Sequence, residues 1–76
     1  MAEAYILLTV AIGKVREVSE QLKEVKGVKN VHILTGPFDI IALVEAEDLS
    51  TLTNTVVEGI RETDGVVDTN TSIVVQ

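Results

Sequence analysis

Two stretches of this chain repeat one pattern, in which a helical segment ends at a glycine and a valine then begins a run of strand-forming residues. The first stretch reads VKGVKNV over residues 25–31, and the second reads TDGVVDT over residues 63–69. A glycine after the last apolar position of a helical repeat is a common helix stop, and β-branched residues favour strands. The chain is therefore predicted to contain two similar halves, each with a helix that leads directly into a strand.

Six predicted elements fill the chain. Strands are predicted at residues 4–12, 28–35, 39–47 and 66–75, and helices at residues 14–27 and 48–65. Both helices carry apolar residues at helical spacing, namely Val15, Val18, Leu22 and Val25 in the first and Leu49, Leu52, Val56 and Ile60 in the second. Asp48 stands where an N-cap residue is expected. Gly36-Pro37 separates two strands that are expected to pair as a hairpin.

The order strand, helix, strand, strand, helix, strand predicts the fold class. It is the split β-α-β or ferredoxin-like α+β fold, βαββαβ, in which two helices cover one face of a four-stranded antiparallel sheet. Right-handed crossovers then place the strands in the order 4-1-3-2. Residues 1–76 are accordingly expected to form one domain.

The two central strands are apolar on both faces. In the first strand, Ile6, Leu8, Val10 and Ile12 alternate with Tyr5, Leu7, Thr9 and Ala11; in the third, Ile40, Ala42, Val44 and Ala46 alternate with Ile41 and Leu43. Helices cover only one face of such a sheet, and an exposed apolar patch of this kind marks an interface. We therefore expect a second copy of the chain to cover the other face, giving a homodimer that resembles an α+β barrel.

Charge and composition restrict the partners of the chain. Twelve acidic and six basic residues give a net charge of -6, whereas nucleic-acid affinity comes largely from clustered lysine and arginine. Direct DNA binding is therefore not expected. The chain has no cysteine, which suits a reducing cytoplasm, and its first apolar run ends at Gly13-Lys14, too early to cross a bilayer. A cytoplasmic protein without membrane contact is expected.

Residues suited to catalysis or metal binding are sparse. His32 is the only histidine and has no acid at ligand spacing, so we expect a half-exposed strand histidine. General acid–base chemistry needs carboxylates with perturbed pKa values in a pocket, but most acids here lie on the predicted helices. No enzyme activity, metal site or cofactor is expected. The hydroxyl run DTNTS at residues 68–72 either protects an edge strand from aggregation or contacts a ligand.

The turn Gly36-Pro37-Phe38-Asp39 allows two interpretations. Glycine and proline account for the chain reversal by themselves, but they do not account for an acid at the mouth of an apolar strand. Asp39 is either part of the turn or the polar contact of a ligand. Gly36 would let a ligand approach the backbone closely, and amide groups around such a turn hold carboxylates. A ligand role alone predicts that Asp39→Ala leaves folding intact.

The stretch LTGPFDIIALVEAEDLSTLTNTV resembles the effector domain of the leucine-responsive and asparagine-responsive regulators, the Lrp/AsnC family, with its strand, TGxxD turn, apolar strand and helix opening with Asp-Leu. VKGVKNVHIL is similar to the helix end and second strand of that domain, and DGVVDTNTSIVV to its closing strand. The resemblance covers essentially all of the chain. The helix-turn-helix domain that precedes this module in the family is not seen, so a stand-alone module, known as a RAM domain for regulation of amino-acid metabolism, is expected.

The resemblance implies a module that senses amino acids and modulates transcription regulators through protein assembly. Family members pair sheet to sheet and assemble into rings of eight or ten chains, with small effectors bound between dimers, and full-length Lrp/AsnC-type regulators are further expected partners. The implied ligand residues are Gly36, Phe38 and Asp39 of the turn and Thr69, Thr71 and Ser72 of the last strand. Asp39 would accept hydrogen bonds from the ammonium group of the amino acid. The alternatives are a purely structural oligomerisation module, an ACT-like regulatory domain and a small dimeric enzyme of this fold.

Overall fold

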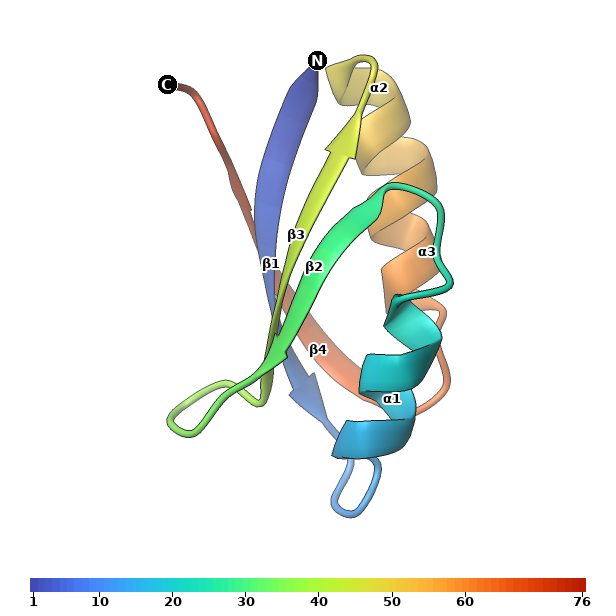
Figure 1. Ribbon diagram of the computed structural model, residues 1–76, viewed down its shortest axis with the longest axis vertical. Coiled ribbons are helices and arrows are strands. Elements are labelled where there is room, and N and C mark those ends of the chain that lie inside the picture. Colours follow the sequence, from blue (N-terminus) through green and yellow to red (C-terminus); the bar gives the residue numbers. More distant parts are fainter.

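A computed structural model describes all residues, 1–76, and shows one sheet with helices on one side (Figure 1). The strands are β1 (Ala2–Val10), β2 (Val28–Ile33), β3 (Ile40–Ala46) and β4 (Val66–Ile73). The first helix is α1 (Val15–Leu22), and the second runs without a break through α2 (Leu49–Thr51), the π-helical turn η1 (Leu52–Val57) and α3 (Glu58–Arg61). All strand pairs are antiparallel, in the order β2-β3-β1-β4. The predicted ferredoxin-like fold and strand order are confirmed.

The core lies between the helices and one face of the sheet. Alternate residues of β1 and β3 are buried there, and they meet the buried residues of both helices: Ala4, Ile6, Leu8, Val10, Ile40, Ala42, Val44, Val18, Leu22, Leu52, Val56 and Ile60. Val15 and Val25 are only partly buried and pack at the margin of this core. The apolar residues predicted on one face of each central strand and on one side of each helix therefore make up most of the core.

Ile12 was predicted to lie in the first strand and Leu49 in the apolar stripe of the second helix, but Ile12 lies beyond β1 and neither side chain joins the core. Ile12 is fully exposed, because β1 ends at Val10 and the chain turns at Gly13, where φ is +82°. Ala11 still bonds through its N–H to the carbonyl of Gly65, at 2.8 Å, but beyond that point no strand continues. Leu49 is 51% exposed because it is the first residue of the second helix, which starts at the end of the sheet (Figure 1).

The predicted N-cap of the second helix is confirmed. An Asp48 carboxylate oxygen, Oδ1, accepts a hydrogen bond from the backbone N–H of Thr51 at 2.7 Å. This bond favours the ionised carboxylate and holds the pKa of Asp48 below its ordinary value. The first helix has no side-chain cap, and it ends at Leu22, earlier than the predicted residue 27, because the chain continues in tight turns from Lys23 to Gly27.

The two glycines of the repeated sequence pattern both have positive φ and both lie against the opposite helix. Gly27 has φ of +98°, and a Cβ built there would lie 2.7 Å from Val56 Cγ2 and 2.9 Å from the carbonyl oxygen of Glu45. Gly65 has φ of +97°, and its Cβ would lie 2.8 Å from Val18 Cγ2. Each position needs glycine for conformation and for space.

We expect Gly27→Ala to destabilise the protein more than Gly13→Ala. Both substitutions place a side chain at positive φ, which costs about 1 kcal/mol, but a Cβ at Gly13 would have nothing within 4 Å. At Gly27 the contacts with Val56 and Glu45 add about 2 kcal/mol of overpacking. Urea unfolding of the two variants and the natural chain at one protein concentration measures the difference. Equal losses at the two positions would contradict close packing around Gly27.

Candidate functional site

The turn between β2 and β3 is tied to the end of β1 by Asp39. Its backbone N–H donates to the carbonyl of Leu8 at 2.9 Å, and its carbonyl accepts from the N–H of Leu34 at 2.8 Å. Its carboxylate oxygen Oδ2 accepts from the N–H of Val10 at 2.9 Å. The regular pairing of β1 with β3 stops at Leu8 and Ile40, so the side chain supplies the next acceptor in place of a backbone carbonyl.

This arrangement decides part of the question that the sequence leaves open. The Asp39 carboxylate has a structural role, because without it the N–H of Val10, a core residue, would lose a charged acceptor. Only oxygen Oδ2 takes part in this bond, and Oδ1 takes part in none of the side-chain hydrogen bonds of the chain.

The other predicted turn residues lie at the surface beside Asp39. Gly36 has φ of +131°, is exposed and has open space around its Cα. Phe38 is partly buried. The hairpin tip extends away from the helices in Figure 1, on the side of the uncovered sheet face.

The predicted residues of β4 do not converge on this turn within one chain. Thr69 and Thr71 pair with Leu8 and Ile6, which point to the helices, and paired residues of an antiparallel ladder share a face. They line a shallow depression with Arg61. Ser72 pairs with Tyr5 and lies on the opposite, uncovered face. The structure therefore groups Gly36, Phe38 and Asp39 and separates them from the three hydroxyl residues.

The uncovered sheet face is apolar at its centre. Leu7 and Tyr5 of β1 pair with Ile41 and Leu43 of β3, and these residues are partly buried except for Tyr5, which is 44% exposed. His32 pairs with Ile41 at the margin of this face. No group of three or more metal-ligating side chains comes together in the chain, and neither helix has the length and apolar character of a membrane span.

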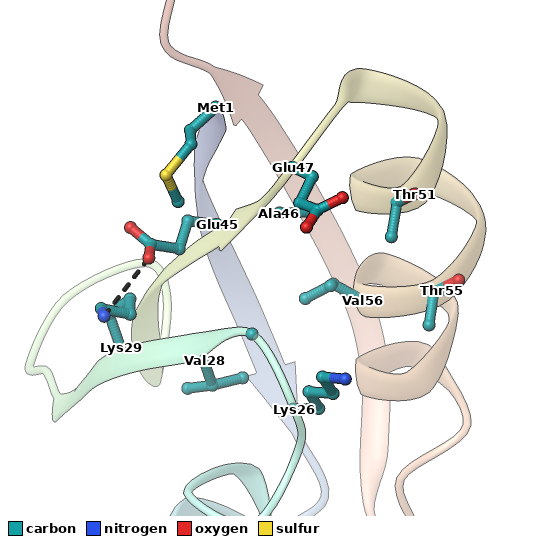
Figure 2. Close-up of a pocket in the computed structure, with 11 residues that line it drawn as sticks. Met1, Lys26, Val28, Lys29, Glu45, Ala46, Glu47, Thr51, Thr55 and Val56 are labelled. Carbon is teal, nitrogen blue, oxygen red and sulfur yellow. Dashed lines mark ion pairs between the residues drawn. The ribbon is translucent and has the colours of Figure 1, made fainter.

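A hollow of about 650 Å³ lies at the other end of the sheet, where β3 leads into the second helix (Figure 2). Its walls come from four places: Met1 at the start of the chain, residues 26–29 before and within β2, residues 45–47 at the end of β3, and one side of the second helix at Thr51, Thr55 and Val56. Ala2 pairs with Ala46 near this hollow and Leu8 with Ile40 near the turn, so about 20 Å separate the two places at the usual rise of a strand.

Sequence reasoning missed this hollow. Its polar residues come from segments that are far apart in the chain, and only the strand register brings them together. The one sequence signal was Gly27, whose role as a helix stop was predicted but whose close contact with β3 was not. The N–H of Glu45 donates to the carbonyl of Gly27 at 2.8 Å, which fixes the two walls to each other.

Comparison with known families identifies the chain. A family model described as the Lrp/AsnC ligand binding domain matches residues 3–76. The chain therefore belongs to the Lrp/AsnC ligand-binding domain family, as its sequence motifs indicated.

Known relatives carry this domain in different settings. The chain is 38% identical over 58 residues to an uncharacterized HTH-type transcriptional regulator from Pyrococcus furiosus, a match covering 76% of this chain and 39% of the regulator. It is 41% identical over 59 residues to a homocitrate synthase from Saccharolobus islandicus, covering 78% of this chain and 13% of the enzyme. The crystal structure of FFRP-DM1 superposes with a TM-score of 0.92 at 36% identity, covering 99% of this chain and 100% of that one. The chain thus spans less than half of these two curated relatives.

We expect Asp39→Ala to lower the free energy of unfolding by about 1–3 kcal/mol, because it leaves the Val10 N–H without its acceptor. Asp39→Asn keeps an acceptor oxygen and is expected to lose less. Asp64→Ala, at an exposed acid, serves as the control and should stay within about 0.5 kcal/mol of the natural chain. Urea unfolding measures all three. If Asp39→Ala is as stable as the control, the hydrogen bond between Asp39 and Val10 does not contribute to the stability of the fold.

Proposed function

We propose that this chain binds a small effector, an amino acid, and acts as an oligomeric regulatory module. The observation that carries this proposal is the match of residues 3–76 to the Lrp/AsnC ligand binding domain, and the family resemblance implies that the ligand is an amino acid. The free Asp39 oxygen supports it, since a carboxylate already held by a backbone N–H is oriented toward a ligand's ammonium group at no further cost in side-chain freedom.

The proposed effector site lies at the turn of residues 36–39 and is completed by a second chain. Gly36 and the exposed amide groups near it would face the carboxylate of the amino acid, Asp39 Oδ1 its ammonium group, and Phe38 its apolar part. Because Thr69, Thr71 and Ser72 lie away from this turn in one chain, these hydroxyls would join the site only from a neighbouring copy. Effector binding and assembly would then be coupled.

The uncovered sheet face is the proposed dimer interface. Tyr5, Leu7, Ile41 and Leu43 form its apolar centre, and each fully covered side chain of this size contributes about 1.5–3 kcal/mol. A second copy presents the same patch, so a twofold pairing is self-complementary. Rings of eight or ten chains are the further assembly that the family resemblance implies.

The setting in which the module works is also proposed. The Pyrococcus furiosus relative is a transcriptional regulator, which supports assembly with full-length regulators of this family. The match to a segment of a homocitrate synthase supports a second candidate, in which the domain regulates an enzyme. In both settings the chain itself performs no catalysis.

We expect one or a few of the twenty amino acids to raise the thermal unfolding temperature of the chain in a dye-based screen. The best ligand is then titrated by calorimetry into the natural chain and into Asp39→Asn, which keeps an oxygen for Val10 but loses the negative charge. The affinity of the Asp39→Asn variant for this ligand should be about tenfold or more below that of the natural chain. Asp64→Asn is the matched control and should bind normally. A screen in which no amino acid raises the unfolding temperature would favour the purely structural oligomerisation module. Equal affinities of the natural chain and Asp39→Asn would show that Asp39 does not contact the ligand.

We expect Leu43→Lys to convert the dimer to monomers, because a lysine would be buried at the centre of the interface without a partner charge. Leu49→Lys is the control, since Leu49 is an exposed leucine on the second helix, away from the uncovered sheet face. Light scattering over a range of concentrations gives the mass of each variant. A natural chain that stays monomeric, or a Leu43→Lys variant that stays dimeric, would contradict the interface.

A further inference from the structure

We propose that the hollow between the end of β3 and the second helix is a second binding site, specific for a linear zwitterion whose carboxylate and ammonium groups are separated by a methylene chain. The site lies within one chain, about 20 Å from the turn at residues 36–39 by the strand rise, and does not depend on the proposed effector function. Its volume of about 650 Å³ is within the usual range for small-molecule sites.

The floor of the hollow is held together by a backbone hydrogen bond and a close packing contact. The Gly27 carbonyl accepts from Glu45 N–H at 2.8 Å, and the Gly27 Cα packs so closely on Val56 that no side chain fits there. Sites on fixed backbone segments of this kind hold their polar groups in place better than mobile loops do.

The charges around the hollow are of both signs, and only part of them are paired. Lys29 Nζ lies 3.3 Å from Glu45 Oε1, and Glu45 is only 24% exposed in its side chain, so these two charges satisfy each other. Lys26 and Glu47 also line the hollow, but they take part in none of the four ion pairs of the chain. Figure 2 shows Lys26 at the lower rim and Glu47 at the upper rim. Lys26 and Glu47, each outside these ion pairs, thus face the same space from opposite rims, and Met1, the N-terminal residue, lines it as well.

The surface between these rims suits an apolar chain with polar ends. Val28, Ala46 and Val56 supply apolar contacts there, and Thr51 and Thr55 line the side formed by the second helix (Figure 2). Thr55 and Val56 belong to the π-helical turn η1, and such turns in helices often occur at functional sites. A ligand carboxylate at Lys26 and a ligand ammonium at Glu47 would place the connecting methylenes over Val56.

This arrangement selects the chemical class of the ligand. A simple anion would leave Glu47 unpaired, and a simple cation would leave Lys26 unpaired. An amino acid with both charges on one carbon has no methylene chain between its charges to cover the apolar surface between the rims. A zwitterion with its charges at opposite ends of the molecule satisfies both rims at once, and its methylenes cover the apolar surface.

The test uses ε-aminocaproate as the probe and records backbone amide NMR shifts of the full chain. We expect the shifts to concentrate at residues 26–29, 45–47 and 51–56, and not at the turn of residues 34–39. Caproate and n-hexylammonium, which each carry one of the two charges, should bind about tenfold more weakly, as expected for loss of one charge-assisted contact. Equal binding of caproate, or shifts outside the hollow, would overturn the proposal.

Two charge variants and one control complete the experiment. Lys26→Gln and Glu47→Gln each remove one rim charge and should each weaken ε-aminocaproate binding by about tenfold. Both side chains are exposed, so neither substitution threatens folding. Glu24→Gln changes an exposed acid that does not line the hollow and should leave binding unchanged. If both rim variants bind the probe as the natural chain does, the hollow is not a charge-selective site.

Discussion

The burial of β1 between two strands and beneath two helices determines where every other element lies. Its inward residues, Ala4 to Val10, form the centre of the core, and its backbone bonds to β3 on one side and to β4 on the other. The end of this strand is completed by the carboxylate of Asp39. The hairpin turn therefore cannot move far without disturbing the strand on which the core depends.

The sequence predicted the order of the elements because two local signals agree with each other throughout the chain. Apolar periodicity marks the helices, and the repeated Gly-Val marks the entry to β2 and β4. Where elements end depends on partners distant in sequence, and there the prediction failed. Ile12 continues an alternating pattern but lies past the last β1 residue, and Leu49 continues a helical stripe but has no strand beneath it.

The candidate site was predictable in part for the same reason. Gly36, Phe38 and Asp39 are neighbours in the sequence, so their grouping in one turn follows from the chain itself. Whether Thr69, Thr71 or Ser72 reaches them depends on the strand register, which shifts at Thr9/Val10 where β1 pairs with β4. To predict the hollow at Gly27, one would need the register of β3 against both β1 and β2 and the position of the second helix beside β3. No local sequence pattern contains that information. Residue types indicate which chemistry a side chain can perform, but only the tertiary structure shows which side chains lie together in one site.

The two glycines of the repeated pattern show how the halves depend on each other. Gly27 ends the segment after the first helix but packs against Val56 of the second, and Gly65 follows the second helix but packs against Val18 of the first. Each half thus closes the helix–strand junction of the other. Neither half contains all the contacts that its own junction makes, so a cut between β2 and β3 would leave each of the two fragments with an incomplete junction. The two similar halves of the sequence are therefore joined by packing at both helix–strand junctions.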